Sequence, residues 1–383
     1  MSELIQERHD RAAVRWKLLT GASALALTTY VSSAAHAEDN VQPQVWIELG
    51  GQLSRLEDGQ ETFSPTFPNS PSRPSIFSPS QKFERPPLYS IDEFGKISFQ
   101  SDGSDWVFSA SIRYGRSVSN RHVHQQTYPK SAPWTKSGVP IYYRSPIRPS
   151  AARYADTKAR DSEHHLILDF QTGKDVGVGM FGAGGTSVLN LGVRFAQFGA
   201  KSDIALKSDP DWHFSYKYVL GENGAWFQPR HNNVAGLLAT RSFHGIGPSI
   251  SWDASAPFAG DVKDGELTFD WAMNAALLFG RQKTKTNHQT TGRYWGKQHK
   301  PTNLPPITYQ GPATPDHTRL RTVTVPDVGG TIGLSWRVEN FKLSAGYRAD
   351  LFFNAMDGGI DAHKSENVGF YGPFATISVG IGG

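Results

Sequence analysis

Two neighbouring segments near the C-terminal end of the chain alternate strictly between apolar and polar residues. The first has one apolar face, formed by Val328, Ile332, Leu334 and Trp336. After a turn of about three residues at 338–340, every second residue from 341 to 353 is apolar or aromatic. Such alternation is typical of β-strands, because successive side chains of a strand point to opposite faces. Each run reaches the roughly 9–11 residues that a tilted strand needs to cross a bilayer, so the pattern predicts a hairpin of a membrane β-barrel.

The same alternation recurs along most of the chain and predicts about ten antiparallel strands, with eight to twelve as the range of the strand number. The predicted strands are residues 44–54, 94–101, 105–116, 165–171, 188–198, 240–254, 266–282, two strands within 322–354, and 368–381. The predicted loops are 55–93, 117–163, 199–239 (with a small hairpin around 212–219 and 225–228), 283–321 and 355–367. Long and short connections alternate, as in outer-membrane barrels with long external loops and short periplasmic turns. We expect an all-β, transmembrane, up-and-down antiparallel β-barrel.

The first 37 residues have the pattern of a cleaved secretory signal peptide. Four basic residues precede an apolar run at 18–31, and Ala35-His36-Ala37 has the A-x-A form that signal peptidase prefers. The apolar run is shorter than the roughly 20 residues of a spanning helix, and no later segment comes closer. We expect export to the cell outer membrane, with residues 38–383 forming a single barrel domain.

The composition agrees with this picture. The chain has no cysteine, so neither disulfides nor thiolate metal sites hold it together. It has 38 Gly, 24 Pro and 12% aromatic residues, and its mean hydropathy is negative. These values suit strands with long polar loops, and a barrel explains the low hydropathy because only one face of each strand meets lipid.

Charged residues gather on the predicted inward faces of the strands. They are Glu48, Lys96, Arg113, Asp169, Arg194, Arg241, Asp253, Asp270, Lys342, Arg348 and Asp350. Asp169 and Arg194 lie on strands joined by one turn, as do Arg241 and Asp270, so each pair is expected to interact. One interpretation is a self-neutralising network that fills a narrow barrel, since closely spaced buried charges are tolerated when paired. The other interpretation is that these residues line an ion path.

A ten-stranded barrel leaves little room for such a path. The interior of a barrel with about eight strands is already filled by side chains, whereas a barrel with a wide aqueous channel has roughly 16–18 strands. We therefore expect a narrow pore, or porin-like channel, for small solutes or ions, with a low conductance. The alternative is a non-conducting structural or adhesion barrel.

Two of the predicted loops are strongly basic. Residues 117–163 and 283–321 carry net charges of about +5 and +6, against +4 for the whole chain. They are either ordinary solvated loops or contacts for anions and for the phosphates of lipopolysaccharide. The candidate contact residues are Arg144, Arg148, Lys283, Lys285 and Arg293. The expected partners are outer-membrane lipid, lipopolysaccharide and the barrel assembly machinery; export excludes nucleic acid, and the oligomeric state stays open.

Two further patterns point to ligands but lack the required context. Residues 177–182 match the dinucleotide pattern GxGxxG, yet the segment that follows has period two and no acidic residue lies about 20 positions on. The pairs His122/His124 and His164/His165 have neither a cysteine nor a regularly spaced acidic cluster beside them. We expect no cofactor and no bound metal.

Several segments resemble the major outer membrane protein family of the Legionella type. They are residues 166–171, LNLGVRFA at 189–196, FHGIGP at 243–248 and GYR at 346–348, within about the last two thirds of the chain. The resemblance implies a pore-forming outer-membrane barrel without catalytic residues. One feature departs from outer-membrane barrels in general, whose last strand usually ends on an aromatic residue: this chain ends with Ile381-Gly382-Gly383.

Two classes of outer-membrane barrel enzyme give alternative interpretations. Ten-stranded proteases use Asp and His at the external rim, where Asp361 and His363 are predicted to lie. Lipid-A deacylases use Ser and His, for which Ser242 and His244 are the candidates. The expected register places Ser242 toward the lumen and His244 toward lipid, so that the two would not share a proton. We therefore expect no enzymatic activity.

Overall fold

The structure of the chain is a computed structural model whose described residues form strands and turns. These residues are 45–58, 88–100, 104, 106–127, 153–176, 186–210, 216–217, 226–298, 307–310 and 314–381. The predicted signal peptide and the glycine-rich residues 177–182 lie outside them. No helix long and apolar enough to cross a membrane occurs in the described part of the chain.

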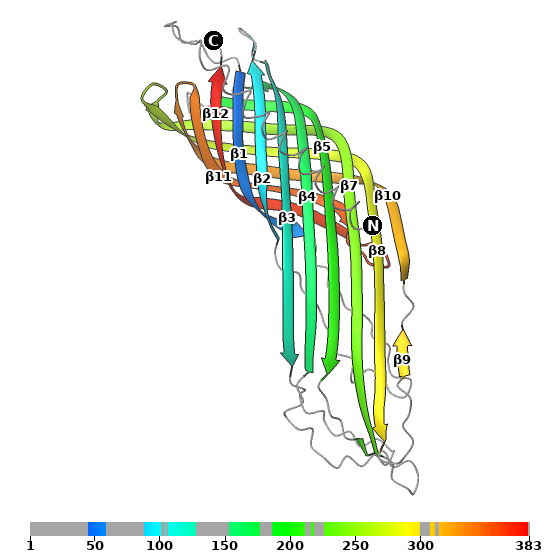
Figure 1. Ribbon diagram of the computed structural model, residues 1–383. Coiled ribbons are helices and arrows are strands. Elements are labelled where there is room, and N and C mark those ends of the chain that lie inside the picture. The colour runs from blue at the N-terminus through cyan, green and yellow to red at the C-terminus, as the bar shows by residue number, and fades with distance from the viewer. Residues whose placement is uncertain are drawn as a thin grey trace, which may run out of the picture.

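Ten long strands form the wall of the described molecule (Figure 1). They are β1 (Val45–Asp58), β2 (Leu88–Gln100), β3 (Trp106–Thr127), β4 (Arg153–Asp175), β5 (Thr186–Pro210), β7 (Trp226–Asp261), β8 (Gly265–Gln298), β10 (Thr314–Val338), β11 (Phe341–Asp357) and β12 (Ser365–Ile381). Two short strands, β6 (Tyr216–Lys217) and β9 (Ile307–Gln310), pair with the outer parts of β7 and β8. The pairing of Tyr216 with Phe227 matches the small hairpin expected near residues 212–228.

The sheet is a closed antiparallel barrel, as predicted. Each long strand pairs with the long strands that precede and follow it along the chain, and β1 pairs with β12 from Val45↔Ile381 onward. Because β7 also pairs with β8, the ring has no open edge among the ten long strands. Closure satisfies the backbone hydrogen bonds internally, which a lipid environment requires.

The two ends of the barrel have different connections. At one end, residues 262–264 join β7 to β8 and residues 339–340 join β10 to β11. Glu339 takes the left-handed backbone conformation, with φ at 48°, and its N–H donates to the carbonyl of Val262 at 2.8 Å. Outer-membrane barrels place their short turns at the periplasmic side, so this rim, with the start of β1 and the end of β12, is the periplasmic one.

The predicted loops 117–163, 199–239 and 283–321 are wrong in large part, because strands continue through much of each. Strands β3, β4, β5, β7, β8 and β10 run beyond the external rim as a curved sheet (Figure 1). β7 has 36 residues, against 17 in β12. The external part of the described chain is therefore largely an extension of one side of the barrel wall.

The missed parts of these strands reverse which face is apolar. In the membrane part of β5, Val193 is exposed on the outside and Arg194 is buried inside; farther out, Lys201 is exposed and Ile204 is buried. The alternation continues, but the outer face first meets lipid and then water, so its polarity changes. Because neither face stays apolar along the whole strand, the expectation of one long apolar face ends the predicted strand at this reversal.

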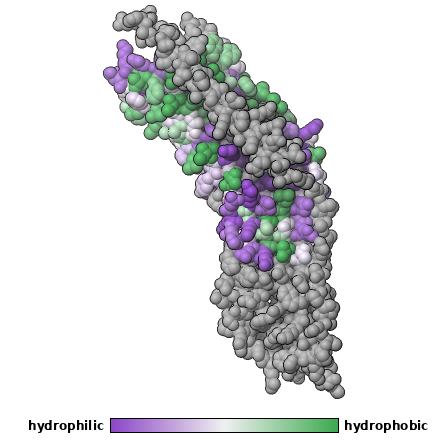
Figure 2. Space-filling view, in the orientation of Figure 1, coloured by the Kyte–Doolittle hydropathy of each residue, from purple (hydrophilic) through white to green (hydrophobic). Residues whose placement is uncertain are grey.

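Apolar side chains predicted to face lipid are exposed on the outside of the barrel. On β8, exposed fractions of 39–58% are found for Leu267, Met273, Leu277 and Phe279. In the space-filling view, hydrophobic residues gather over the barrel and hydrophilic residues gather over the part below it (Figure 2). This outward apolar band confirms the alternation from which the barrel was predicted.

Candidate functional site

The lumen holds a cavity of about 580 Å³ on the side of the periplasmic turns. Inward-facing residues from all ten long strands line it, including every predicted lumen charge except Arg241. Its charged residues are Glu48, Asp169, Asp253, Glu266, Asp270 and Asp350 against Lys96, Arg113, Arg194, Arg337, Lys342 and Arg348. Six acidic and six basic side chains give this wall no formal net charge.

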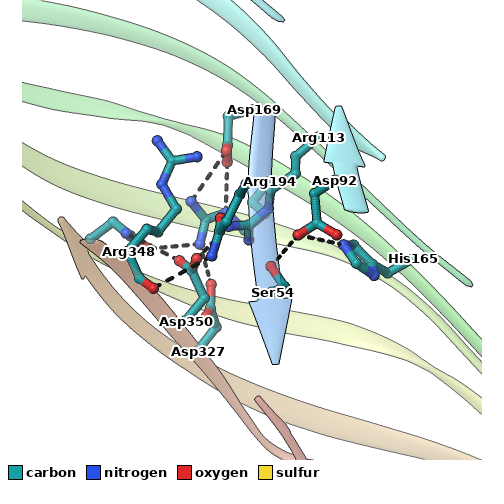
Figure 3. Close-up of polar contacts among 11 residues, drawn as sticks. Ser54, Asp92, Arg113, His165, Asp169, Arg194, Asp327, Arg348 and Asp350 are labelled. Carbon is teal, nitrogen blue, oxygen red and sulfur yellow. Dashed lines mark hydrogen bonds and ion pairs between the residues drawn. The ribbon is translucent and has the colours of Figure 1, made fainter. Parts of the chain in front are cut away.

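Arg194 is the centre of a charged network at the external end of the cavity (Figure 3). Its Nε donates to Asp169 Oδ1 at 2.6 Å, its Nη1 donates to Asn274 Oδ1 at 2.8 Å, and it also pairs with Asp327. The pair with Asp169 is the one expected from adjacent strands. Asp327 was missed, although it stands next to Val328 of the apolar face and therefore belongs to the opposite, inward face.

A second ion pair lies beside the first in the lumen (Figure 3). Arg113 of β3 pairs with Asp350 of β11, and their side chains are 7% and 3% exposed. Arg348, two residues before Asp350, places its guanidinium 4.7 Å from the ring centroid of Phe94 and 5.4 Å from that of Phe374. Pairing and ring contacts of this kind offset the high cost of burying charge.

The ion pairs nearer the periplasmic rim are more exposed. Lys342 pairs with Asp270 at 2.7 Å, and Lys96 pairs with Asp253 at 3.9 Å. The predicted interaction of Arg241 with Asp270 is wrong. The register places Arg241 opposite Thr284 and Asp270 opposite Ser255, so the two residues lie far apart along the β7–β8 pair.

On the external side of the charged network the lumen is filled by apolar side chains, which we call the aromatic layer. Its members are Leu56, Ile167, Ala196, Phe198, Phe243, Leu278, Val325, Phe352, Ala355, Met356, Val368 and Phe370. The four phenylalanines are 0–2% exposed, and the ring centroid of Phe198 lies 4.7–5.7 Å from those of the other three. Ions cross such a layer only if these side chains move, because an ion loses its water in apolar surroundings.

Sequence reasoning missed the aromatic layer because inward residues were recognised by their charge and apolar residues were assigned to lipid. A signal was present. Phe352 stands between Leu351 and Phe353, both assigned to the outside, and therefore belongs to the opposite face. Phe198 lies four residues after Arg194 on the same strand and therefore shares its inward face.

His165 lies beside the aromatic layer, between two carboxylates. Its Nε2 is 3.3 Å from Asp92 Oδ2 and its Nδ1 is 3.2 Å from Glu163 Oε1, while its ring centroid is 4.0 Å from that of Phe370. A Cβ at Gly115 of β3 would meet both Asp92 and His165, so the absence of a side chain there lets β2 and β4 make contact across β3. The polar contacts of this cluster are thus shielded from both lipid and water.

The histidine pairs considered as metal ligands do not come together. His164 is exposed on the outer face, whereas His165 is buried on the inner face. His122 pairs with Asp156 at 3.3 Å, and the side chain of His124 lies outside the described residues. Among the described residues, no group of three or more His, Cys, Asp or Glu side chains is placed to hold a metal ion.

The segment between β11 and β12, residues 358–364, folds against the inner face of the extended sheet. Arg241 Nη2 donates to the carbonyl of Gly358 at 2.8 Å, and Arg319 Nη1 donates to that of Ile360 at 2.7 Å. Ile360 packs against a second apolar cluster, formed by Ala159, Ile204, Leu206, Ala235 and Leu237. The segment therefore covers the external side of the aromatic layer.

Asp357, beyond the membrane part of β11, holds the start of this segment. Arg319 Nε donates to its Oδ2 at 2.8 Å, and the N–H groups of Gly359 and Lys364 donate to its Oδ1 at 3.0 and 3.1 Å. Burial raises the pKa of the Asp357 carboxyl, but these hydrogen bonds and the charge of Arg319 hold that pKa below its ordinary value.

The residues considered for catalysis lie apart or in other contacts. The predicted placement of Ser242 and His244 on opposite faces is wrong, because residues two apart on a strand share a face. Both occupy outward positions, and Arg241 and Phe243 point inward. Asp361 pairs with His288 at 2.6 Å.

The predicted anion-contacting residues fall into two groups. Arg144, Arg148 and the side chain of Arg293 lie outside the described residues. Lys283 and Lys285 are described, and both stand on β8 instead of in a loop, exposed at outward positions. The loop assignment of these two lysines is therefore wrong, and contact of either lysine with an anion stays a prediction.

A closed barrel of tilted strands with an apolar outer band and a charged lumen defines an outer-membrane β-barrel protein. The family described as the Legionella pneumophila major outer membrane protein precursor matches residues 150–381. The chain belongs to this family, and it is a protein of the outer membrane. No curated protein sequence matches the chain.

Solved structures show only a distant likeness. The transport unit of the autotransporter AIDA-I from Escherichia coli is 9% identical, with 95% of this chain and 98% of that chain covered and a TM-score of 0.24. The translocator domain of NalP from Neisseria meningitidis is 10% identical, with 97% of each chain covered and a TM-score of 0.22. A mutant of the TodX monoaromatic hydrocarbon channel is 8% identical, with 89% and 91% covered and a TM-score of 0.20.

Proposed function

We propose that the protein is a narrow pore for small ions or solutes, closed by the aromatic layer in the conformation described. The polar cavity of about 580 Å³ carries this proposal. A barrel that needed only stability would gain as much from apolar side chains, since buried ion pairs are often no better than well-packed hydrophobic residues. A charge-lined half-lumen is instead suited to hydrated solutes.

Three obstacles separate the cavity from the external medium: the charged network around Arg194, the aromatic layer and residues 358–364. Hydrophobic constrictions gate pores by excluding water, and small shifts of the blocking side chains admit it. Passage through ten strands is narrow even then. The proposal therefore combines a low conductance with brief openings, and the balanced wall charge favours weak selectivity between anions and cations.

Planar-bilayer recording of the refolded wild-type protein tests this proposal. We expect small, brief events in the wild type and longer openings in Phe198→Ser/Phe352→Ser, which removes two rings from the aromatic layer. Phe108→Ser/Phe279→Ser is the matched control, because both of its phenylalanines are exposed on the outer face, and its lumen events should equal those of the wild type. A wild-type protein that never conducts overturns the proposal.

A non-conducting barrel that supports the extended external sheet is the second candidate. The closed lumen favours it, as do strands of up to 36 residues that reach beyond the rim. This candidate predicts a silent wild type and conductance only after the aromatic layer is opened by Phe198→Ser/Phe352→Ser. The two candidates thus differ in the behaviour of the unmodified protein.

We further propose that the protein has no enzymatic activity. The contact of Asp361 with His288 and the outward positions of Ser242 and His244 support this view. Incubation of the folded barrel with a dibasic peptide and with lipid A tests it. Turnover of either compound that is abolished by His363→Ala, or by Ser242→Ala, would contradict it.

A further inference from the structure

The outer surface of the barrel carries exposed basic side chains that take no part in the lumen networks. Five of them occupy outward positions of four strands, and we call them the basic belt: Arg116 of β3, Arg160 of β4, Lys201 of β5, and Arg281 and Lys283 of β8. In contrast to Arg113 and Arg194 in the lumen, none of the five forms an ion pair within the described part of the chain.

The strand register joins the basic belt into one continuous surface. Arg116 stands opposite His164, and the row of pairings continues through Gly199 and Ser242 to Lys283. This row crosses five neighbouring strands.

The other members of the basic belt lie close to this row. Arg281 is one outward position nearer the membrane, Lys201 is one outward position farther out, and Arg160 is two. Asp203, opposite Arg160 in the register, offsets one of the five charges. The surface is left strongly positive.

The basic belt begins where the apolar outer band ends. Phe279, 54% exposed, is the outward residue that precedes Arg281, and Ile112, 48% exposed, lies two outward positions before Arg116. Leu320, 67% exposed, stands opposite Lys283. Basic side chains thus stand directly above a lipid-facing surface, at the foot of the extended sheet and at the level of lipid head groups.

We propose that the basic belt binds the phosphate groups of the phosphorylated glycolipid in the outer leaflet. Arginine donates paired hydrogen bonds to phosphate oxygens, and lysine adds a compact positive charge. The acyl chains of the same molecule would lie along Phe279 and Ile112, which favours a lipid over dissolved phosphate. This inference does not depend on whether the lumen conducts.

The test uses the full chain folded in neutral detergent micelles, with purified bisphosphorylated lipid A as the probe and equilibrium binding as the readout. Arg281→Gln/Lys283→Gln removes two belt charges. The control variant, Lys174→Gln/Lys263→Gln, also removes two positive charges, but from exposed residues near the periplasmic rim. We expect the belt variant to bind lipid A about 30-fold more weakly, because it loses the attraction of two basic side chains to an anionic lipid surface. The control variant should bind lipid A like the wild type.

Three outcomes would overturn the proposal: equal affinities of the two variants, equal binding of lipid A from which both phosphates have been removed, and complete displacement of lipid A by millimolar inorganic phosphate. Heat-modifiable migration in electrophoresis shows whether each variant has folded. If the belt variant fails to fold, Arg160→Gln/Lys201→Gln replaces it, because both residues lie beyond the membrane part of the wall, and the same weakening is expected.

Discussion

Removal of the Arg194 side chain should destabilise the barrel strongly. Arg194→Met keeps most of the side-chain length but leaves Asp169 and Asp327, whose side chains are 16% and 0% exposed, without their shared cation. Removing one partner of a buried ion pair costs about 3–5 kcal/mol, because the remaining charge stays buried. We expect a loss of this size in the free energy of unfolding, measured by urea titration of tryptophan fluorescence in detergent micelles.

Two further variants show whether this loss comes from unpaired buried charge. Lys96→Met breaks a pair whose side chains are 30% and 39% exposed, and such pairs contribute about 0–1 kcal/mol. The triple variant Arg194→Met/Asp169→Asn/Asp327→Asn should recover most of the stability, since no charge is then left without a partner. A loss for Arg194→Met no larger than that for Lys96→Met would refute the reasoning.

Three other predictions follow from the same contacts. Phe352→Ala should lower the free energy of unfolding by about 3–5 kcal/mol through a lumen cavity, and Phe279→Ala on the lipid face should cost less; equal losses in the urea titration would contradict the inward assignment of Phe352. Because the folded-state pKa of Asp357 is lowered, its hold on residues 358–364 should persist above about pH 4 and weaken as pH falls further, whereas Asp357→Asn should speed proteolysis of this segment already at pH 7. Lys96→Glu should shift the reversal potential of any conductance toward cation selectivity, and an unchanged potential would place the ion path elsewhere.

The barrel itself could be predicted because its apolar outer band appears in the sequence as a regular alternation of apolar and polar residues. Runs such as the one from 341 to 353 alternate over a length that only a membrane strand needs, and short turns such as 339–340 fix where the strands reverse. The extended sheet could not be predicted in the same way. Beyond the membrane the outer face of β5 changes from Val193 to Lys201, so the alternation persists while its polarity is reversed.

The contacts inside the lumen could be predicted only where they join residues of adjacent strands. Asp169 and Arg194 face one another on adjacent strands, so their pairing follows from one hairpin. Arg113 and Asp350 are 237 residues apart in sequence and meet only because the ring closes. The aromatic layer depends on that closure in the same way, since eight strands contribute to it, and no single strand indicates that Phe198 meets Phe370.

Cysteine accessibility tests the closed lumen most directly, because the natural chain has no cysteine. Ser344→Cys places a thiol on the cavity wall and Phe370→Cys places one in the aromatic layer. With the protein oriented in proteoliposomes, a charged thiol reagent should label Ser344→Cys rapidly from the periplasmic side and far more slowly from the external side, and it should leave Phe370→Cys almost unlabelled. Equally rapid labelling of Ser344→Cys from both sides would contradict the account.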